Sequence, residues 1–283
     1  MPFAEPLPAP LHPARMDVEG LSVAYDGRYA LQGLSFRLEH GSRVAVVGPN
    51  GAGKSTLFKA LVGLVAAREG SILIHGLPLG GHQDCVAYVP QRENVDWNFP
   101  VTVRDVVMMG RYGQLGWLSR PRKRDRDIVA DSLAQMGMAD FAGRSINELS
   151  GGQQQRVFLA RALAQEPHIF LMDEPFNGVD APTQEATFAL LDRLRRDGVT
   201  ALISTHDLNL AATRFDRVLL LNRELVAEGP PAQVLVESNL TRAFGSVLLV
   251  TEGKNFLVDE CCPGEHTNNY DKTGCLDEGG EFR

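Results

Sequence analysis

The sequence contains no run of about eighteen apolar residues, the length that is typical of a membrane-spanning helix. It also lacks an excess of basic residues, because its formal net charge is −7, and this argues against nucleic-acid binding. The proline-rich start, MPFAEPLPAPLHPAR, has no apolar segment of the kind found in signal peptides. These absences predict a chain that is soluble or that reaches a membrane only through a partner.

Cysteine is scarce, and its four positions are too few for a disulfide framework in a chain of 283 residues. We expect reduced thiols of a cytosolic protein. The cysteines are Cys85, Cys261, Cys262 and Cys275. The last three, with His266, match no zinc-binding spacing. We therefore expect an acidic, partly disordered extension over 251–283, and a disordered lead-in over 1–15.

What the sequence does contain is an alternation of strand-like and helix-like segments. Residues 16–38 alternate apolar and polar side chains around an Asp-Gly turn, which predicts antiparallel strands. Continuous apolar runs at 44–48 and 168–174 are typical of strands buried on both faces, and 102–164 has helical spacing. The pattern predicts an α/β fold with a mainly parallel sheet, an N-terminal antiparallel β subdomain and a helical insertion.

A glycine-rich segment, GPNGAGKST, follows the first buried strand and opens a helix. It fits the pattern G-x-x-x-x-G-K-[ST] in the context that a phosphate-binding loop requires, which disfavours a glycine turn without a ligand. Lys54 supplies a positive charge to phosphates, and the hydroxyl of Ser55 suits Mg²⁺. The candidate ATP contacts are Gly48, Pro49, Asn50, Gly51, Ala52, Gly53, Lys54, Ser55 and Thr56.

Two acidic residues end the second buried strand, HIFLMDE. Asp173 is placed to hold Mg²⁺ through water, and Glu174 to polarise an attacking water. The alternative, two solvated acids at a strand end, loses weight beside a phosphate loop.

A second candidate anion site lies at LSGGQQQRV, 149–157. Two glycines at the start of a predicted helix leave its first amides accessible to a ligand. One chain that already has a phosphate loop needs a reason for this second site.

Three motifs in order, GPNGAGKST, LSGGQ and LMDEP, resemble the nucleotide-binding subunits of ABC transporters, over about residues 16–235. The resemblance implies a P-loop NTPase domain over 16–250, with a helical subdomain at about 92–160, that hydrolyses ATP with Mg²⁺. It also implies a head-to-tail homodimer in which LSGGQ contacts the ATP of the other subunit, and this explains the second anion site. The contacts expected there are Ser150, Gly151, Gly152 and Gln153.

The same resemblance assigns roles to four further residues. Tyr25 matches the aromatic ring that stacks on adenine, with a cross-strand packing role as the alternative. Gln91 matches the glutamine that contacts Mg²⁺ and water, and His206 the catalytic histidine near the γ-phosphate. Asp180 matches the aspartate of dimer communication, although FNGVD departs here from the common Ser-Ala-Leu-Asp.

The stretch QRENVDWNFPVTVRDVVMMGRYG, 91–113, is similar to the subunits of bacterial manganese, zinc and iron importers. This implies contact with transmembrane permease subunits, an extracytoplasmic metal-binding protein upstream, and a peripheral position on the cytoplasmic face of the membrane. Large apolar residues could line a groove for the permease or pack in the helical core instead. They are Trp97, Phe99, Val101, Val103 and Met108.

The favoured cargo is therefore manganese, followed by zinc or iron. The first alternative is the ATPase of an iron-chelate or cobalamin importer. A soluble ABC ATPase that acts on ribosomes or DNA is disfavoured, since the chain has one cassette, no heptads and no basic arm. An exporter is disfavoured because no membrane domain is fused to the cassette.

Overall fold

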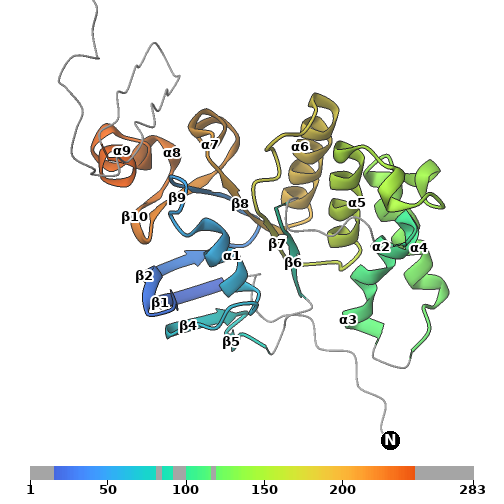
Figure 1. Cartoon of the computed structure of the whole chain (residues 1–283), viewed down its shortest axis with the longest axis horizontal. Coiled ribbons are helices and arrows are strands. Elements are labelled where there is room, and N and C mark those ends of the chain that lie inside the picture. Colours follow the sequence, from blue (N-terminus) through green and yellow to red (C-terminus); the bar gives the residue numbers. More distant parts are fainter. Residues whose placement is uncertain (1–15, 81–84, 92–99, 116–118, 246–283) are drawn as a thin grey trace, which may run out of the picture.

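The computed structural model describes residues 16–80, 85–91, 100–115 and 119–245 (Figure 1). The lead-in expected over 1–15 and the extension expected over 251–283 lie outside these residues. Within them, no helix is both long enough and apolar enough to cross a membrane.

A six-stranded sheet forms the centre of the molecule, in the order β10-β9-β3-β8-β7-β6. Five neighbouring strands run parallel, and β10 pairs antiparallel with β9 at one edge. This confirms the expected mainly parallel core. The strands are β3 (Arg43–Val47), β6 (Val86–Val89), β7 (Ile169–Met172), β8 (Thr200–Thr205), β9 (Arg217–Asn222) and β10 (Glu224–Gly229).

A separate antiparallel sheet, in the order β2-β1-β4-β5, is the expected N-terminal β subdomain. Its first hairpin turns at Asp26 and Gly27, both with positive φ, as the Asp-Gly pair predicts. The strands are β1 (Met16–Tyr25), β2 (Arg28–Leu38), β4 (Glu69–Ile74) and β5 (Leu77–Pro78).

The helices from α2 to α5 gather on one side of the central sheet as the helical insertion (Figure 1, green). The first helix starts at Lys54, directly after its N-cap residue Gly53, which is in the left-handed region. The helices are α1 (Lys54–Leu61), α2 (Val103–Met108), α3 (Tyr112–Leu115), α4 (Lys123–Gln135), α5 (Gly151–Leu163), α6 (Ala181–Arg196), α7 (Leu208–Arg214), α8 (Pro231–Val234) and α9 (Glu237–Phe244).

Strand β3 shows why its sequence is apolar throughout. Val44 and Val46 pack into the core shared with α1 and the antiparallel sheet, whereas Ala45 and Val47 pack into the core shared with α5 and α6. Alternate residues of a strand point to opposite faces, so a strand covered on both faces must be apolar at every position. This double burial holds the loops at the carboxyl end of the sheet in place.

Candidate functional site

The phosphate loop joins β3 to α1 and packs against neighbouring backbone. A Cβ atom on Gly48 would lie 2.0 Å from the carbonyl oxygen of Leu221, and one on Gly53 would lie 2.5 Å from Leu31 Cδ2. Gly51 and Gly53 also have φ of 77° and 96°, which non-glycine residues rarely adopt. The loop thus keeps its shape only with glycine at these positions, and this shape directs backbone amides inward.

Lys54 is the charged residue of this loop, and it is buried. Its Nζ donates to the carbonyl oxygens of Gly48 at 2.7 Å and of Pro49 at 3.1 Å. The same nitrogen lies 3.8 Å from Glu174 Oε1. A buried ammonium is stabilised by such partners, and here they hold the charge at the loop.

Asp173 follows β7 and is only 2 % exposed. Its Oδ1 accepts a hydrogen bond from Ser204 Oγ at 2.6 Å, whereas its Oδ2 is buried and has no hydrogen-bond partner among the described residues. A buried carboxylate oxygen without a partner is costly, and a bound cation would remove that cost. The site therefore fits Mg²⁺, which prefers oxygen ligands.

Gln91 is brought to the same edge of the sheet by strand pairing. Its strand, β6, lies parallel to β7, and Asp173 N donates to Val89 O at 3.0 Å, so the two strand ends are side by side. Ser55 lies in the first turn of α1, next to Lys54. The three predicted oxygen ligands of Mg²⁺, Ser55, Gln91 and Asp173, therefore lie at the carboxyl end of the central sheet.

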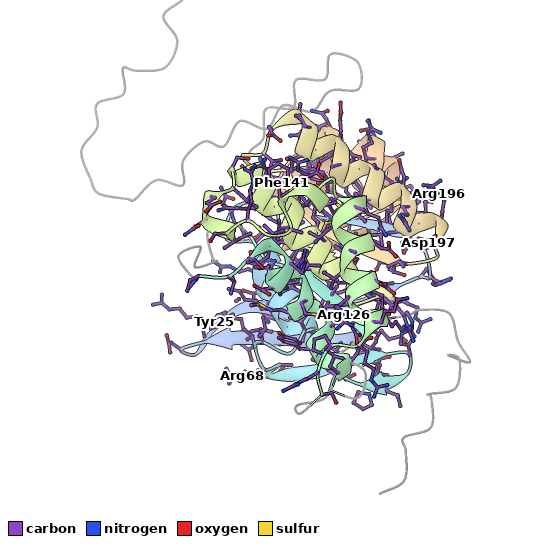
Figure 2. The ribbon with its side chains drawn as sticks, turned by 90° about the vertical axis from the view of Figure 1, so that its right-hand side faces the viewer. Tyr25, Arg68, Arg126, Phe141, Arg196 and Asp197 are labelled. Carbon is purple, nitrogen blue, oxygen red and sulfur yellow. The ribbon has the colours of Figure 1, made fainter. Side chains whose placement is uncertain are left out.

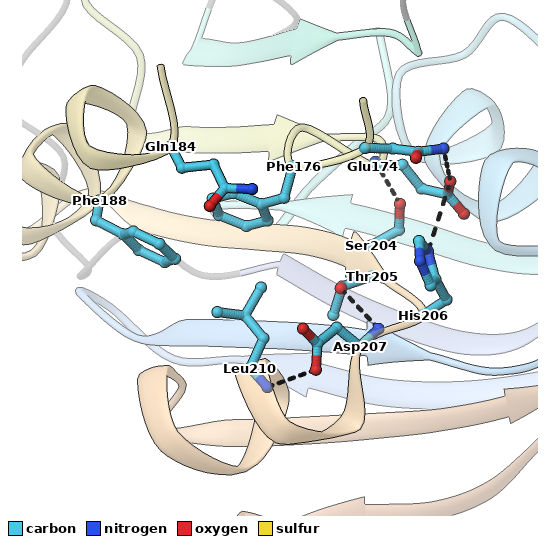
Figure 3. Close-up of a pocket in the computed structure, with 10 residues that line it drawn as sticks. Glu174, Phe176, Gln184, Phe188, Ser204, Thr205, His206, Asp207 and Leu210 are labelled. Carbon is cyan, nitrogen blue, oxygen red and sulfur yellow. Dashed lines mark hydrogen bonds and ion pairs between the residues drawn. The ribbon is translucent and has the colours of Figure 1, made fainter. Parts of the chain in front are cut away.

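Glu174 and His206 lie next to one another at one end of a pocket of about 150 Å³ (Figure 3). His206 Nδ1 lies 4.0 Å from Glu174 Oε2, and Asn177 Nδ2 donates to the same oxygen at 3.4 Å. Glu174 has a φ of 47°, a conformation that costs on the order of 1–3 kcal/mol and is often found at functional sites. Its backbone N–H donates to Ser204 Oγ at 2.8 Å, which holds it there.

Ser204 is the residue that sequence reasoning missed. It is fully buried in β8, and its single hydroxyl donates to Asp173 while it accepts from Glu174. The available signal was one serine in the apolar strand TALIST, two residues before His206.

Burial is the larger cause that raises the pKa of Tyr88 on β6, and the negative charge of Asp173 raises it further.

Tyr25 lies at the end of β1, at the tip of the first hairpin, and its side chain is partly exposed. Figure 2 shows it at the margin of the antiparallel sheet. A ring exposed in this way can stack on a flat ligand.

The second candidate anion site is the start of α5. Ser150 Oγ accepts from Gln153 N at 3.4 Å, and Ser150 N donates to Gln153 Oε1 at 2.9 Å, which forms a capping box. Within the part of the chain that the structure describes, the Ser150 hydroxyl donates no hydrogen bond, so its proton is available to a ligand. A Cβ atom on Gly152 would lie 2.6 Å from Thr183 Oγ1, so α5 approaches α6 too closely for a side chain there.

Asp180 caps the start of α6 and lies beside this same glycine. Its Oδ1 accepts from Thr183 N at 2.9 Å, and the hydrogen bonds from Thr183 lower the pKa of the carboxyl. Both carboxylate oxygens lie 3.0 Å from the point where a Cβ of Gly152 would be. The structure thus joins the expected dimer-communication residue to the LSGGQ segment within one chain.

Comparison with known proteins decides the family. The family model described as ABC transporter matches residues 31–177, which is just over half of the chain. The chain belongs to the ABC transporter family. The zinc transport system ATP-binding protein TroB of Treponema pallidum is 48 % identical over 230 residues, which cover 81 % of this chain and 86 % of that relative. The manganese transport system ATP-binding protein MntB of Bacillus subtilis is 45 % identical over 239 residues, covering 84 % and 96 %.

A solved structure shares the fold of this ABC ATPase. The dimeric ATP-binding cassette MJ0796, in a post-hydrolysis state with ADP and Pi bound, has a TM-score of 0.66 and 28 % identity, covering 76 % of this chain and 98 % of that one. The expected P-loop fold, the resemblance to metal importers, ATP binding and ATPase activity are therefore confirmed. The roles of the individual site residues stay predictions that the geometry supports.

Proposed function

We propose that this ABC ATPase is the ATP-hydrolysing subunit of an importer for a divalent transition metal, with manganese as the first candidate and zinc or iron next. Its similarity to subunits of zinc and manganese transport systems supports this cargo over an iron chelate or cobalamin. The observation that supports the ATPase chemistry is a cluster of side chains at the carboxyl end of the central sheet. Strand pairing brings together Gln91, Asp173, Glu174 and His206 there, and Lys54 lies 3.8 Å from Glu174.

In this mechanism the phosphate loop binds the nucleotide. Its backbone amides and Lys54 neutralise the β- and γ-phosphates, and the dipole of α1 adds to their effect. Ser55, Gln91 and Asp173 would hold Mg²⁺, which when bound neutralises charge that develops on the phosphate oxygens. Ser204 keeps the Asp173 carboxylate oriented through its 2.6 Å hydrogen bond.

Glu174 orients the attacking water and accepts its proton, since its carboxylate is held between Lys54 and Asn177. His206, whose side chain is 60 % exposed, lies 4.0 Å from Glu174 and supports the γ-phosphate beside it. The rate of ATP hydrolysis is increased by the positioning of the reactants and by fixed charges, as in other phosphoryl transfers.

The second copy of the chain completes each site. The helix start at Ser150–Gln153 and the phosphate loop belong to different parts of one chain, so two copies in head-to-tail pairing supply both halves twice. The dimeric state of the MJ0796 cassette supports this arrangement. Asp180, packed against Gly152, would carry a change at the phosphate end of one subunit to the LSGGQ segment at the interface.

The permease contact falls within 91–113. Residues 92–99 of this stretch, among them Trp97 and Phe99, lie outside the described residues. Val103 is fully buried, so for this residue the core-packing alternative holds. In the described part of the stretch, the large apolar side chains that are exposed are instead Met109 and Tyr112. We place the protein at the cytoplasmic face of the membrane through this contact, with an extracytoplasmic metal-binding protein delivering the cargo.

The first experiment replaces the proposed base. Glu174→Gln should retain ATP binding, abolish turnover and accumulate as an ATP-bound dimer in gel filtration, because the amide cannot accept the proton. Glu185→Gln, an exposed change on α6, is the matched control and should behave as the native protein. Native turnover in Glu174→Gln would show that the base assignment is wrong.

The cargo is tested in cells that carry the native chain or Glu174→Gln. Cellular metal content is measured by mass spectrometry under limiting manganese, zinc and iron in turn. A selective fall of one metal in the variant names the cargo. No change in any of the three would favour an iron-chelate or cobalamin importer.

A further inference from the structure

Three residues with metal-binding side chains meet away from the nucleotide site. His75 lies in the turn after β4, Cys85 immediately precedes β6, and His168 immediately precedes β7. One ligand atom from each lies within 4.8 Å of the other two. The three residues come from both sheets and from distant parts of the chain, so their meeting is a product of the tertiary structure.

The geometry of this His-Cys-His cluster suits a small ion. His168 Nδ1 and His75 Nε2 are 3.1 Å apart, and the two rings meet edge to face at 83°. Two nitrogens bound to one tetrahedral zinc, at about 2.0–2.1 Å each, lie roughly 3.3 Å apart. Binding would therefore require only a small movement of the two rings, in which the ion replaces the contact between them.

Backbone hydrogen bonds hold two of the three residues, Cys85 and His168, next to each other. His168 N donates to Cys85 O at 2.8 Å, and Thr200 N donates to His168 O at 3.0 Å, so the starts of three adjacent strands are tied together. His75, in the turn after β4, has a φ of 52°, which is uncommon outside glycine. In this turn its Nε2 lies 3.1 Å from His168 Nδ1. The part of the cluster that strand pairing holds, Cys85 and His168, is pre-formed, which lowers the cost of binding an ion.

We propose that His75, Cys85 and His168 form a binding site for a borderline-soft transition-metal ion of the Zn²⁺ class, with water as the fourth ligand. Two imidazoles and a thiolate are typical ligands of zinc. Mg²⁺ and Mn²⁺ prefer oxygen ligands and would bind poorly here. The site does not depend on the proposed transport function, because it rests on the ligand geometry alone.

The site is separate from the one that serves ATP. Its residues lie at the amino ends of β6 and β7, whereas Gln91 and Asp173 follow the carboxyl ends of the same two strands. At about 3.3 Å per residue, these strands keep the two sites roughly 15–20 Å apart. An ion at the cluster would also clamp the β4 turn of the antiparallel sheet to the central sheet, and so raise the Tm of the protein.

The test uses the full chain, stripped of metal and free of nucleotide. Co²⁺ is added and the thiolate-to-cobalt charge-transfer absorption is recorded, followed by displacement with Zn²⁺. Cys85→Ser should lose the absorption and bind Zn²⁺ at least about tenfold more weakly. The matched control replaces the other three thiols, Cys261, Cys262 and Cys275, with serine and should keep one Zn²⁺ per chain. Absorption that persists in Cys85→Ser, or that disappears in the control, overturns the proposal.

The histidines are tested in the same way, with ATPase activity as the check that each variant folds. His75→Ala and His168→Gln should each weaken Zn²⁺ binding at least about tenfold, whereas His40→Ala, an exposed histidine outside the cluster, should not. Zn²⁺ binding of native strength in both cluster variants would show that the two rings are only a hydrogen-bonded pair.

Discussion

Replacement of Ser204 by alanine isolates the hydroxyl that joins the two acidic residues of the ATPase site. The Oγ atom is fully buried, donates to Asp173 Oδ1 at 2.6 Å and accepts from Glu174 N at 2.8 Å. A hydrogen bond to a charged group contributes about 1.5–3 kcal/mol, and a buried N–H left without a partner adds to the loss. We expect a decrease in the free energy of unfolding of about 2 kcal/mol or more.

Two assays follow from this magnitude. A loss of about 2 kcal/mol lowers the Tm of a chain of this size by about 4–8 °C, which scanning calorimetry resolves. The kcat for ATP should fall by up to about a hundredfold, because Glu174 loses the contact that holds its φ of 47°, while KM changes little. We expect the phosphate loop and Lys54, which come from a different part of the chain than Ser204, to bind the nucleotide as before.

The matched control is Ser42→Ala, which removes a serine hydroxyl that donates to Glu39 O at 2.6 Å on the surface. Its Tm and kcat should stay near the native values. If Ser204→Ala has the native Tm and the native kcat, the buried hydroxyl does not organise the two acids, and the reasoning is refuted.

The remaining predictions concern the helix contacts and the exposed aromatic ring. Gly152→Ala should lower ATPase activity and Tm, because its Cβ would lie 2.6 Å from Thr183 Oγ1; the Tm cost should be smaller in a Thr183→Ala background, and equal costs would contradict the clash. Asp125→Asn should destabilise the protein by about 1–3 kcal/mol, since Asp125 Oδ1 lies 3.3 Å from Nε of the buried Arg111 and the substitution removes this charge pair. Hydrogen bonding to Arg122 N, the largest cause, lowers the pKa of Asp125, so chemical denaturation should show this difference in full at neutral pH and a decline as the pH falls below about 4. Tyr25→Ala should weaken ATP binding about threefold to tenfold in a direct titration, and unchanged affinity would remove its stacking role.

The strands were predictable where their apolar residues alternate or form a continuous run. The antiparallel hairpin of 16–38 alternates apolar and polar residues, and the buried strands β3 and β7 are continuous apolar runs. The C-terminal elements β10, α8 and α9 were not predicted, because they are short and, unlike β3 and β7, contain no continuous apolar run.

The apolar residues of the helical insertion show a different limit. Val103 and Met109 lie six positions apart in the same apolar-rich segment of the sequence. The side chain of Val103 is nevertheless fully buried, whereas that of Met109 is exposed. An apolar side chain predicts burial without saying whether the neighbour that covers it belongs to the same chain or to a partner. Only the packing of α2 against α4 and α5 decides this.

The amino-acid sequence by itself determined the chemistry that is contiguous along the chain: the phosphate loop with Lys54 and Ser55, the acidic pair after β7, and the capped start of α5. In each case the functional atoms belong to neighbouring residues, so spacing and residue type are sufficient. The tertiary structure alone decided which distant residues meet. Ser204 and Asp173 are 31 residues apart, and His75 and His168 are 93 apart. Ser204 and Asp173 meet because the parallel strands β7 and β8 align their carboxyl ends, whereas His75 meets His168 because the antiparallel sheet packs against the central sheet. No local pattern records which strands or sheets become neighbours.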